Sequence, residues 1–265
     1  MKVFNSQEME EIIIAIVALL ASALTFFSGF GLGTVLMPVF AVFFPIDLAI
    51  ALTAIVHFLN NVFKFFLTGK HVDKSILLRF GLPSIVAAFI GALLLNYLSH
   101  LQPLMLWNYS GQTFEITPIK LIIALLLIFF ALFDIIPKLK NMHFSRKYLP
   151  TGGVISGFFG GLSGHQGALR SAFLIRAGLS KETFIATGIA IACLIDITRL
   201  SVYSKNILAV KDSIDWKMVI IATLSAFAGA VLGNKILKKI TIETVQMVVA
   251  AALIVFAVFL GLGII

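Results

Sequence analysis

Three basic side chains of this sequence fall inside apolar segments, where a charge is costly: Lys64, Arg170 and Arg199. Ionisable residues at such positions are candidates for function. Asp196 stands three residues before Arg199, so the two can pair on one helical face. Because a guanidinium offers oxyanions a planar fork of donors, this set predicts an anion site in which Asp196 holds Arg199 in place. The alternative is a structural ion pair within the membrane.

The segment TAIVHFLNNVFKFFL carries a polar stripe. Its members His57, Asn60, Asn61 and Lys64 are spaced i, i+3, i+4, i+7, which places them on one face of a helix. A polar face on an apolar helix points to a cavity or to a polar partner helix, and we assign these four side chains to the substrate site. Two structural alternatives stay open: hydrogen bonds between helices without a ligand, and a Lys64 side chain that reaches water at the helix end.

Residues 152–177, GGVISGFFGGLSGHQGALRSAFLIRA, are apolar but contain seven glycines. A glycine inside a helix costs roughly 1 kcal/mol relative to alanine, which disfavours one continuous helix. We predict two half-helices that meet near 164–166, with Gly164 and Gly167 as backbone hinges. Half-helix ends expose N–H groups and a positive dipole end, which suit an anion. The alternative is one bent helix whose glycines let a neighbour pack closely.

The middle of this stretch is polar. We expect Ser163, His165, Gln166 and Arg170 to contribute to the same substrate site, because a break in the helix lets side chains on both sides of it converge. His57 and His165 lack the third His or Cys that a typical zinc site needs. We therefore expect neither a metal nor another cofactor.

The composition is that of an integral membrane protein. The chain has 265 residues, of which 60% are hydrophobic and 12% charged, and its mean hydropathy is +1.07. The net charge of +8 sits in short loops, so it does not indicate nucleic-acid binding. The single cysteine, Cys193, excludes an internal disulfide. The N-terminus, with one Lys followed by three Glu, is a poor signal peptide.

Ten apolar segments predict an all-α, polytopic membrane protein with about 8–10 membrane segments. They span about 12–27, 30–45, 47–68, 76–97, 118–137, 152–163, 167–177, 181–204, 216–234 and 242–263. The first two and the sixth and seventh are short and interrupted by glycine, and Gly31 and Gly33 are the hinge candidates in the first pair.

The two halves repeat weakly. An offset of 134 residues aligns Gly33 with Gly167 and Thr53 with Thr187. Each half then has one broken pair and three full crossings, and an odd number of crossings inverts the second half relative to the first. We predict two inverted repeats, 1–137 and 138–265, within one membrane domain, a plan common among secondary transporters.

Loop charges predict the orientation. One face carries twelve Lys and Arg, in loops 69–79, 138–150, 176–182 and 235–241, and the other face carries five. The positive-inside rule makes the first face cytoplasmic. Both termini and the longest loop, 98–117, then lie outside a cytoplasmic membrane that the chain crosses several times. Trp107 and Tyr109 of that loop are the expected anchors at the membrane interface.

Two glycine-rich stretches carry a resemblance to a known family. They read SGFGLGTVLMPVFAVFFPIDLAIALTAIVHFLNN and GFFGGLSGHQGALRSAFLIRAGLSKETFIATG, and nearly the whole chain resembles the sulfite exporter TauE/SafE family, also called the toluene sulfonate uptake permeases. The resemblance implies a transporter, not an enzyme, that moves a small anion such as sulfite or an organosulfonate. In this chain His165, Gln166 and Arg170 interrupt the family's glycine pattern, and Ala172 replaces its proline, so sulfate or a carboxylate stays open as the substrate.

A rival hypothesis is an intramembrane serine protease. Residues 161–164, Gly-Leu-Ser-Gly, match the Gly-x-Ser-Gly pattern of rhomboid proteases, which need a general base on a later helix. The histidines stand at 57, 71, 100, 143 and 165, and none falls on a later helix. The sequence therefore favours the transporter.

Cysteine labelling tests the orientation. In a Cys193→Ala background, Tyr109→Cys is expected to react with a membrane-impermeant maleimide from outside the cell. Lys70→Cys, in a loop on the opposite face, is expected to react only after permeabilisation. Labelling of Tyr109→Cys from the cytoplasm alone would reverse the predicted orientation.

Overall fold

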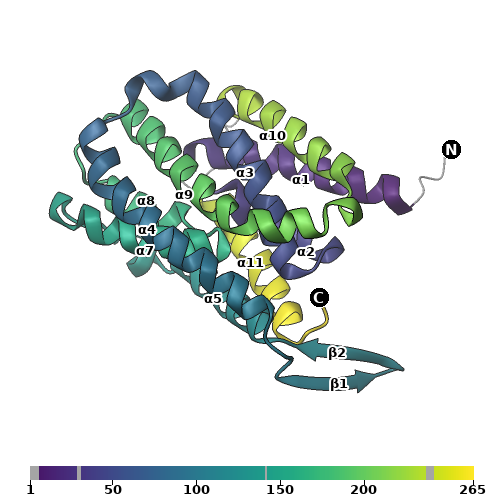
Figure 1. Ribbon diagram of the computed structural model, residues 1–265. Helices are drawn as coiled ribbons and strands as arrows, with labels where there is room; N and C mark the ends of the chain where they lie inside the picture. The colour runs from purple at the N-terminus through teal and green to yellow at the C-terminus, as the bar shows by residue number, and fades with distance from the viewer. Residues whose placement is uncertain (1–5, 29–30, 141, 237–241) are drawn as a thin grey trace.

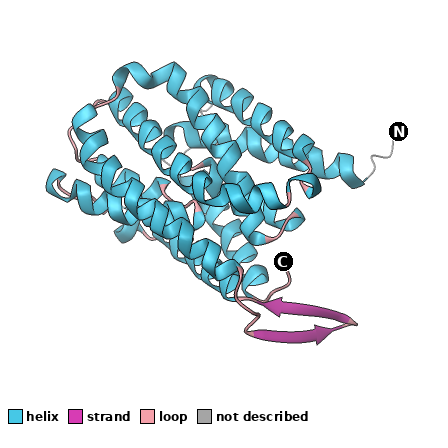
Figure 2. Ribbon diagram, viewed as in Figure 1, coloured by secondary structure: helices cyan, strands magenta, loops and turns pink. Residues whose placement is uncertain are grey.

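The protein is a bundle of apolar helices with one small hairpin (Figures 1 and 2). The computed structural model describes residues 6–28, 31–140, 142–236 and 242–265. Its longer helices are α1 (Ser6–Ser28), α2 (Leu32–Phe43), α3 (Ile46–Thr68), α4 (Lys74–Ser99), α5 (Pro118–Ile135), α7 (Leu149–Ser163), α8 (Gly167–Leu174), α9 (Lys181–Ala209), α10 (Trp216–Ile236) and α11 (Ile242–Gly261). The short elements are α6 (Pro137–Lys140), η1 (Gly69–His71), η2 (Arg146–Tyr148) and η3 (Lys211–Ser213).

Each of the ten predicted apolar segments is a helix, so the all-α class is confirmed. Within the described residues, four helices (α3, α4, α9 and α10) are long and apolar enough to cross a membrane, and α2, α5 and α11 have shorter apolar stretches. Lys2, Lys238 and Lys239, which entered the charge count, lie outside the described residues. The orientation therefore stays a prediction.

Two helices extend well beyond their apolar segments, by five residues or more. Helix α1 begins at Ser6 although the apolar run begins near residue 12, and α9 continues to Ala209 although the predicted segment ends at 204. Polar residues can continue a helix beyond its apolar part, and Glu11 in the first turns of α1 pairs with Lys217 of α10 at 2.7 Å. Hydropathy alone marks the apolar part of a helix and misses such extensions.

The loop 98–117 contains a hairpin that the apolar pattern did not predict. Strands β1 (Met105–Tyr109) and β2 (Gln112–Ile116) pair antiparallel across a two-residue turn. Both turn residues, Ser110 and Gly111, have positive φ, at 51° and 79°, which matches the twist of a tight hairpin. Trp107 Nε1 donates to Leu262 O at 2.8 Å, so the hairpin is attached to the end of α11.

Glycines let two helix pairs approach very closely. Along α7, Gly153, Gly157 and Gly161 lie against the backbone of Phe80, Ser84 and Ala88 in α4, and a Cβ at any of the three would overlap that backbone. Gly229 and Gly233 of α10 lie in the same way against Leu19 and Ala23 of α1. Small residues are what membrane helices need for such contact. Three glycines of residues 152–177 therefore serve the close helix packing that the sequence offered as the alternative to a break.

Helices α3 and α9 pack against each other between these two pairs. Helix α3 also packs on α10, and α9 also packs on α4. His57 lies eleven residues into the 23-residue α3, and Asp196 lies fifteen residues into the 29-residue α9. At about 1.5 Å per residue, both stand near the middle of their helices. This central crossing positions the candidate site.

Substitution of Gly157 tests the close approach of α4 and α7. We expect Gly157→Ala to destabilise the protein by about 1–3 kcal/mol, because the new methyl group meets the Ser84 backbone, which cannot rotate away. Gly261→Ala is the control, since its Cβ would make an ordinary contact with Ala124. Thermal unfolding in detergent measures both, and equal stability of the two variants would contradict the proposed packing.

Candidate functional site

The predicted break in 152–177 is present. Helix α7 ends at Ser163, Gly164 adopts a left-handed conformation with φ of 82°, and α8 begins at Gly167. Glycine suits this conformation because it has no Cβ to clash. Ser156 Oγ donates to Gln166 O at 3.1 Å, which ties the break back to α7. The stretch thus contains both predicted features, glycines for packing and a break at 164–166.

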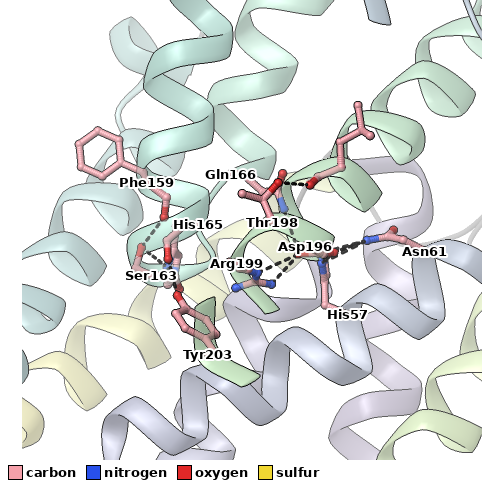
Figure 3. A network of polar contacts seen from close by, with 12 residues as sticks. His57, Asn61, Phe159, Ser163, His165, Gln166, Asp196, Thr198, Arg199 and Tyr203 are labelled. Carbon is pink, nitrogen blue, oxygen red and sulfur yellow. Dashed lines mark hydrogen bonds and ion pairs between the residues drawn. The ribbon is translucent and has the colours of Figure 1, made fainter. Parts of the chain in front are cut away.

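A network of polar side chains surrounds the buried carboxylate of Asp196 (Figure 3). His57 Nδ1 lies 2.6 Å from Oδ2, and Asn61 Nδ2 donates to the same oxygen at 3.4 Å. Arg199 donates through Nε to Oδ1 at 3.0 Å, and its Nη2 lies 2.7 Å from Oδ1. Gln166 Nε2 also donates to Oδ1, at 3.4 Å. One carboxylate therefore joins α3, the break and α9.

Lys64 and Asn60 belong to a neighbouring group on the same face of α3. With the Asn60 amide oriented to satisfy its neighbours, its oxygen accepts from Lys64 Nζ at 3.1 Å and its nitrogen donates to Ala226 O at 3.2 Å. Ser22 of α1 is also within hydrogen-bond distance of that amide, at 3.2 Å. Lys64 is buried, so its ammonium does not reach water at the helix end.

A cavity of about 50 Å³ lies beside this network, toward the end of α3 and the start of α9. Among its lining residues are five of the predicted substrate-site residues (His57, Asn60, Asn61, Lys64 and Arg170) and the predicted hinge Gly31. Its other walls come from Thr25, Gly31, Leu32, Ser171, Leu174, Phe184, Ile185, Gly188 and Ile189. The volume suits a few waters or one small ion. Arg170 is held there by Gln166, whose Oε1 accepts from Nη1 at 3.2 Å.

Five of the predicted substrate-site residues do not line this cavity. Gln166, Asp196 and Arg199 belong to the network, whereas the His165 ring, beside Ser163, stacks on Phe130 of α5 with ring centroids 5.3 Å apart. His165 Nδ1 lies 3.2 Å from Ser163 Oγ, and the Ser163 hydroxyl donates to Phe159 O at 3.1 Å. The structure thus does not place His165 beside Arg170 in one pocket.

The hinge glycines of the first half lie beside those of the second. A Cβ built on Gly31 would be 3.6 Å from His57 Nε2, and one built on Gly33 would be 3.9 Å from Gly164 O. Gly31 precedes α2, and Gly167 begins α8. Both breaks therefore approach the centre of the α3–α9 crossing, where the polar network lies.

A second and larger cavity, which we call the vestibule, has a volume of about 330 Å³ and lies at the opposite ends of the same helices. It is lined by the start of α3 (Pro45, Asp47, Leu48, Ala51), the end of α4 (Leu95, Asn96, Ser99, His100) and the end of α9 (Tyr203, Asn206, Ile207, Ala209, Val210). Tyr203 continues the face of Asp196 and Arg199 at i+7 and i+4. The spacing along α9 could have indicated this position, but a single tyrosine near a helix end is common and does not stand out as an ionisable residue does.

These apolar helices around a buried charged centre define a multi-pass membrane protein. A family model described as Sulfite exporter TauE/SafE matches residues 14–260. The chain therefore belongs to the sulfite exporter TauE/SafE family of membrane transporters, and the resemblance read from its glycine-rich stretches is confirmed. Among curated proteins and among solved structures, no significant match to this chain is found.

Removing the charge of Asp196 tests whether the network supports the fold. We expect Asp196→Asn to destabilise the protein by about 3–5 kcal/mol, because Arg199 is left buried without a counter-charge. Adding Arg199→Met is expected to restore much of that loss. Glu11→Gln is the control: its partner Lys217 stays exposed to water, and we expect a change below about 1 kcal/mol. Thermal unfolding of the three variants and the parent decides, and an Asp196→Asn protein as stable as the parent would contradict this role.

Proposed function

We propose that this protein is a secondary transporter that moves a small anion across the cytoplasmic membrane through the centre of the α3–α9 crossing. The observation that carries the proposal is the cavity between these helices, which Lys64 and Arg170 line beside the Asp196 network. As expected from the sequence, the proposed partners are a small anionic substrate and the lipid bilayer, and we propose no nucleic-acid partner.

The charges of this region favour an anion. Lys64, Arg170 and Arg199 contribute three positive charges, and Asp196 contributes one negative charge, which leaves a formal surplus of two. In a poorly solvated interior such a surplus attracts an anion and repels a cation. His57, Asn60 and Asn61 add neutral polar groups at the same wall. A small anion with two or three oxygens matches these donors in charge and in number.

The two cavities support movement through the protein. The small cavity lies toward the end of α3 and the start of α9, whereas the vestibule lies toward the start of α3 and the end of α9. The buried Asp196 network separates them. An anion that crosses must pass this network, and a site with an approach on each side is what transport by alternating access requires.

The packing of the helices supports two repeats, joined near 138–150. If α1 to α5 correspond in order to α7 to α11, the close pair α4–α7 corresponds to the close pair α10–α1. The pairs α3–α9 and α5–α11 then each correspond to themselves. We propose on this basis that 1–137 and 138–265 are inverted copies. Cysteine labelling of the two faces, as described for Tyr109 and Lys70, tests the inversion.

For the substrate we propose sulfite or an organosulfonate, by membership of a family described as sulfite exporters. Sulfate and small carboxylates present a similar compact negative group and are the alternatives. The volume of about 50 Å³ supports a small anion over a bulky one.

The contact of Ser163 with His165 is the one observation that favours the protease hypothesis, since a serine nucleophile needs a base within hydrogen-bond reach. The Ser163 hydroxyl, however, donates to Phe159 O within its own helix and is buried. His165 Nε2 has no hydrogen-bond partner among the described residues, so no third group orients the ring as a catalytic triad requires. We therefore propose transport and not proteolysis.

A thermal-shift panel on the purified protein tests the proposed substrate class. We expect sulfite or a short sulfonate to stabilise the folded state, by about 2.7 kcal/mol when its concentration is a hundred times its Kd. Arg170→Ala should remove this effect and abolish transport, since Arg170 lines the cavity. Arg176→Ala, in an exposed part of the following loop, is the matched control and should behave as the parent. Stabilisation by cations or neutral solutes alone would refute the proposal.

A further inference from the structure

Tyr203 lies between the vestibule and the polar network. Its side chain lines the vestibule, yet it is only 3% exposed. Arg199 is one helical turn before it on α9, and Figure 3 shows Tyr203 on the side of Arg199 away from Asp196 and His57. Figure 3 shows His165 on that same side of Arg199.

The break in the α7–α8 stretch gives Tyr203 its partner. A helix leaves its last carbonyl groups without intrahelical partners, and those of α7 end at Ser163. The Tyr203 hydroxyl donates to one of them, Gly161 O. This hydrogen bond links the far half of α9 to the last turn of α7. It joins two elements that must separate if the vestibule is to connect with the network.

Behind Tyr203 lie two buried side-chain nitrogens without hydrogen-bond partners among the described residues, one on Arg199 and one on His165. Arg199 Nη1 and His165 Nε2 have no hydrogen-bond partner within the part of the chain that the structure describes. Arg199 is fully buried and His165 is 4% exposed. Nη1 lies so close to Gly164 that a Cβ there would be 2.7 Å from it. Unpaired buried polar groups are costly, and such groups in a native structure call for an explanation.

We propose that Arg199 Nη1 and His165 form a second anion subsite on the vestibule side of the network, and that Tyr203 is the gate that closes it. This inference rests on the proposed function, because it gives the transported anion its second binding position. When the Tyr203 hydroxyl leaves Gly161 O, the subsite opens to the vestibule and an oxyanion accepts from Arg199 Nη1. His165 Nδ1 already faces Ser163 O, so Nε2 donates to the anion once the ring is protonated.

Asp196 meets only part of the Arg199 guanidinium. Only one edge of the guanidinium, Nε with Nη2, faces the carboxylate. The other nitrogen is directed to the break, on the side of His165 and Tyr203 (Figure 3). An anion in the small cavity would meet Lys64 and Arg170, and an anion on the vestibule side would meet Arg199 and His165. Asp196 lies between the two positions.

Accessibility of a reporter cysteine tests the gate. The protein carries Ser163→Cys in a Cys193→Ala background and sits in sealed vesicles. The probe is 2-sulfonatoethyl methanethiosulfonate, an anionic reagent that does not cross membranes. We expect slow labelling with Tyr203 intact. Tyr203→Phe should raise the rate from the face of the β1–β2 hairpin roughly 2- to 12-fold, the change in population expected from losing one hydrogen bond.

Matched variants separate a gate from a structural cap. Tyr97→Phe, on the exposed face of α4, makes the same change outside the network and should leave the rate unchanged. Tyr203→Leu removes the ring as well and should raise the rate further. If Tyr203 only caps α7, both Tyr203 variants lower thermal stability without a faster reaction at position 163, and the gate is refuted. A faster reaction only from the opposite face refutes it too.

The charge preference of the reagent tests the subsite. In the Tyr203→Phe protein we expect the anionic reagent to react faster than its trimethylammonium counterpart, relative to their rates with a free thiol. The pair Asp196→Asn and Arg199→Gln, which leaves the total charge unchanged, should abolish this preference, and an unchanged preference would overturn the subsite. These labelling experiments can be read without a transport assay. If sulfite does not bind but Tyr203→Phe still speeds labelling, the proposed function is refuted. If transport is normal but Tyr203→Phe does not change labelling, this inference is refuted.

Discussion

The neutralisation of one buried carboxylate is the constraint on which the centre of this protein depends. Asp196 is fully buried in an apolar bundle, where an isolated charge is very costly. Its oxygens are met by His57 and Asn61 from α3, by Gln166 from the break and by Arg199 from its own helix. Together these partners make the buried charge tolerable. The carboxylate therefore fixes the relative positions of α3, α9 and the broken α7–α8 stretch.

The glycine-lined helix pairs make that arrangement possible. Helices α4 and α7 touch along their backbones, and α1 and α10 do the same, so the bundle is held together without bulky side chains at these contacts. The same run of glycines in 152–177 then ends in Gly164, whose positive φ breaks the helix at the level of the network. Close packing and the break are thus two uses of one glycine-rich sequence. The break frees carbonyl groups that side chains such as Tyr203 must satisfy.

The basic residues divide between two tasks. Arg199 is held by Asp196 and ties the network together, whereas Lys64 and Arg170 stand at the wall of the small cavity and add positive charge there. Lys64, Arg170 and Arg199 against Asp196 leave a formal charge of +2 among these four side chains, so the centre of the bundle is suited to an anion. Membership of the sulfite exporter TauE/SafE family agrees with this electrostatic character.

The sequence by itself determined the ten apolar helices, the break at 164–166, the family and the polar face of α3, because hydrophobicity, glycine content and helical spacing are local properties. It also singled out Lys64, Arg170, Asp196 and Arg199, because ionisable residues stand out within apolar segments. Only the tertiary structure decided which of these side chains meet. The His57–Asp196 contact joins residues 139 apart, His165 turns to Phe130 and away from Arg170, and Tyr203 reaches Gly161 O. Such pairings depend on how helices pack and rotate, and the spacing of residues along one helix does not contain that information.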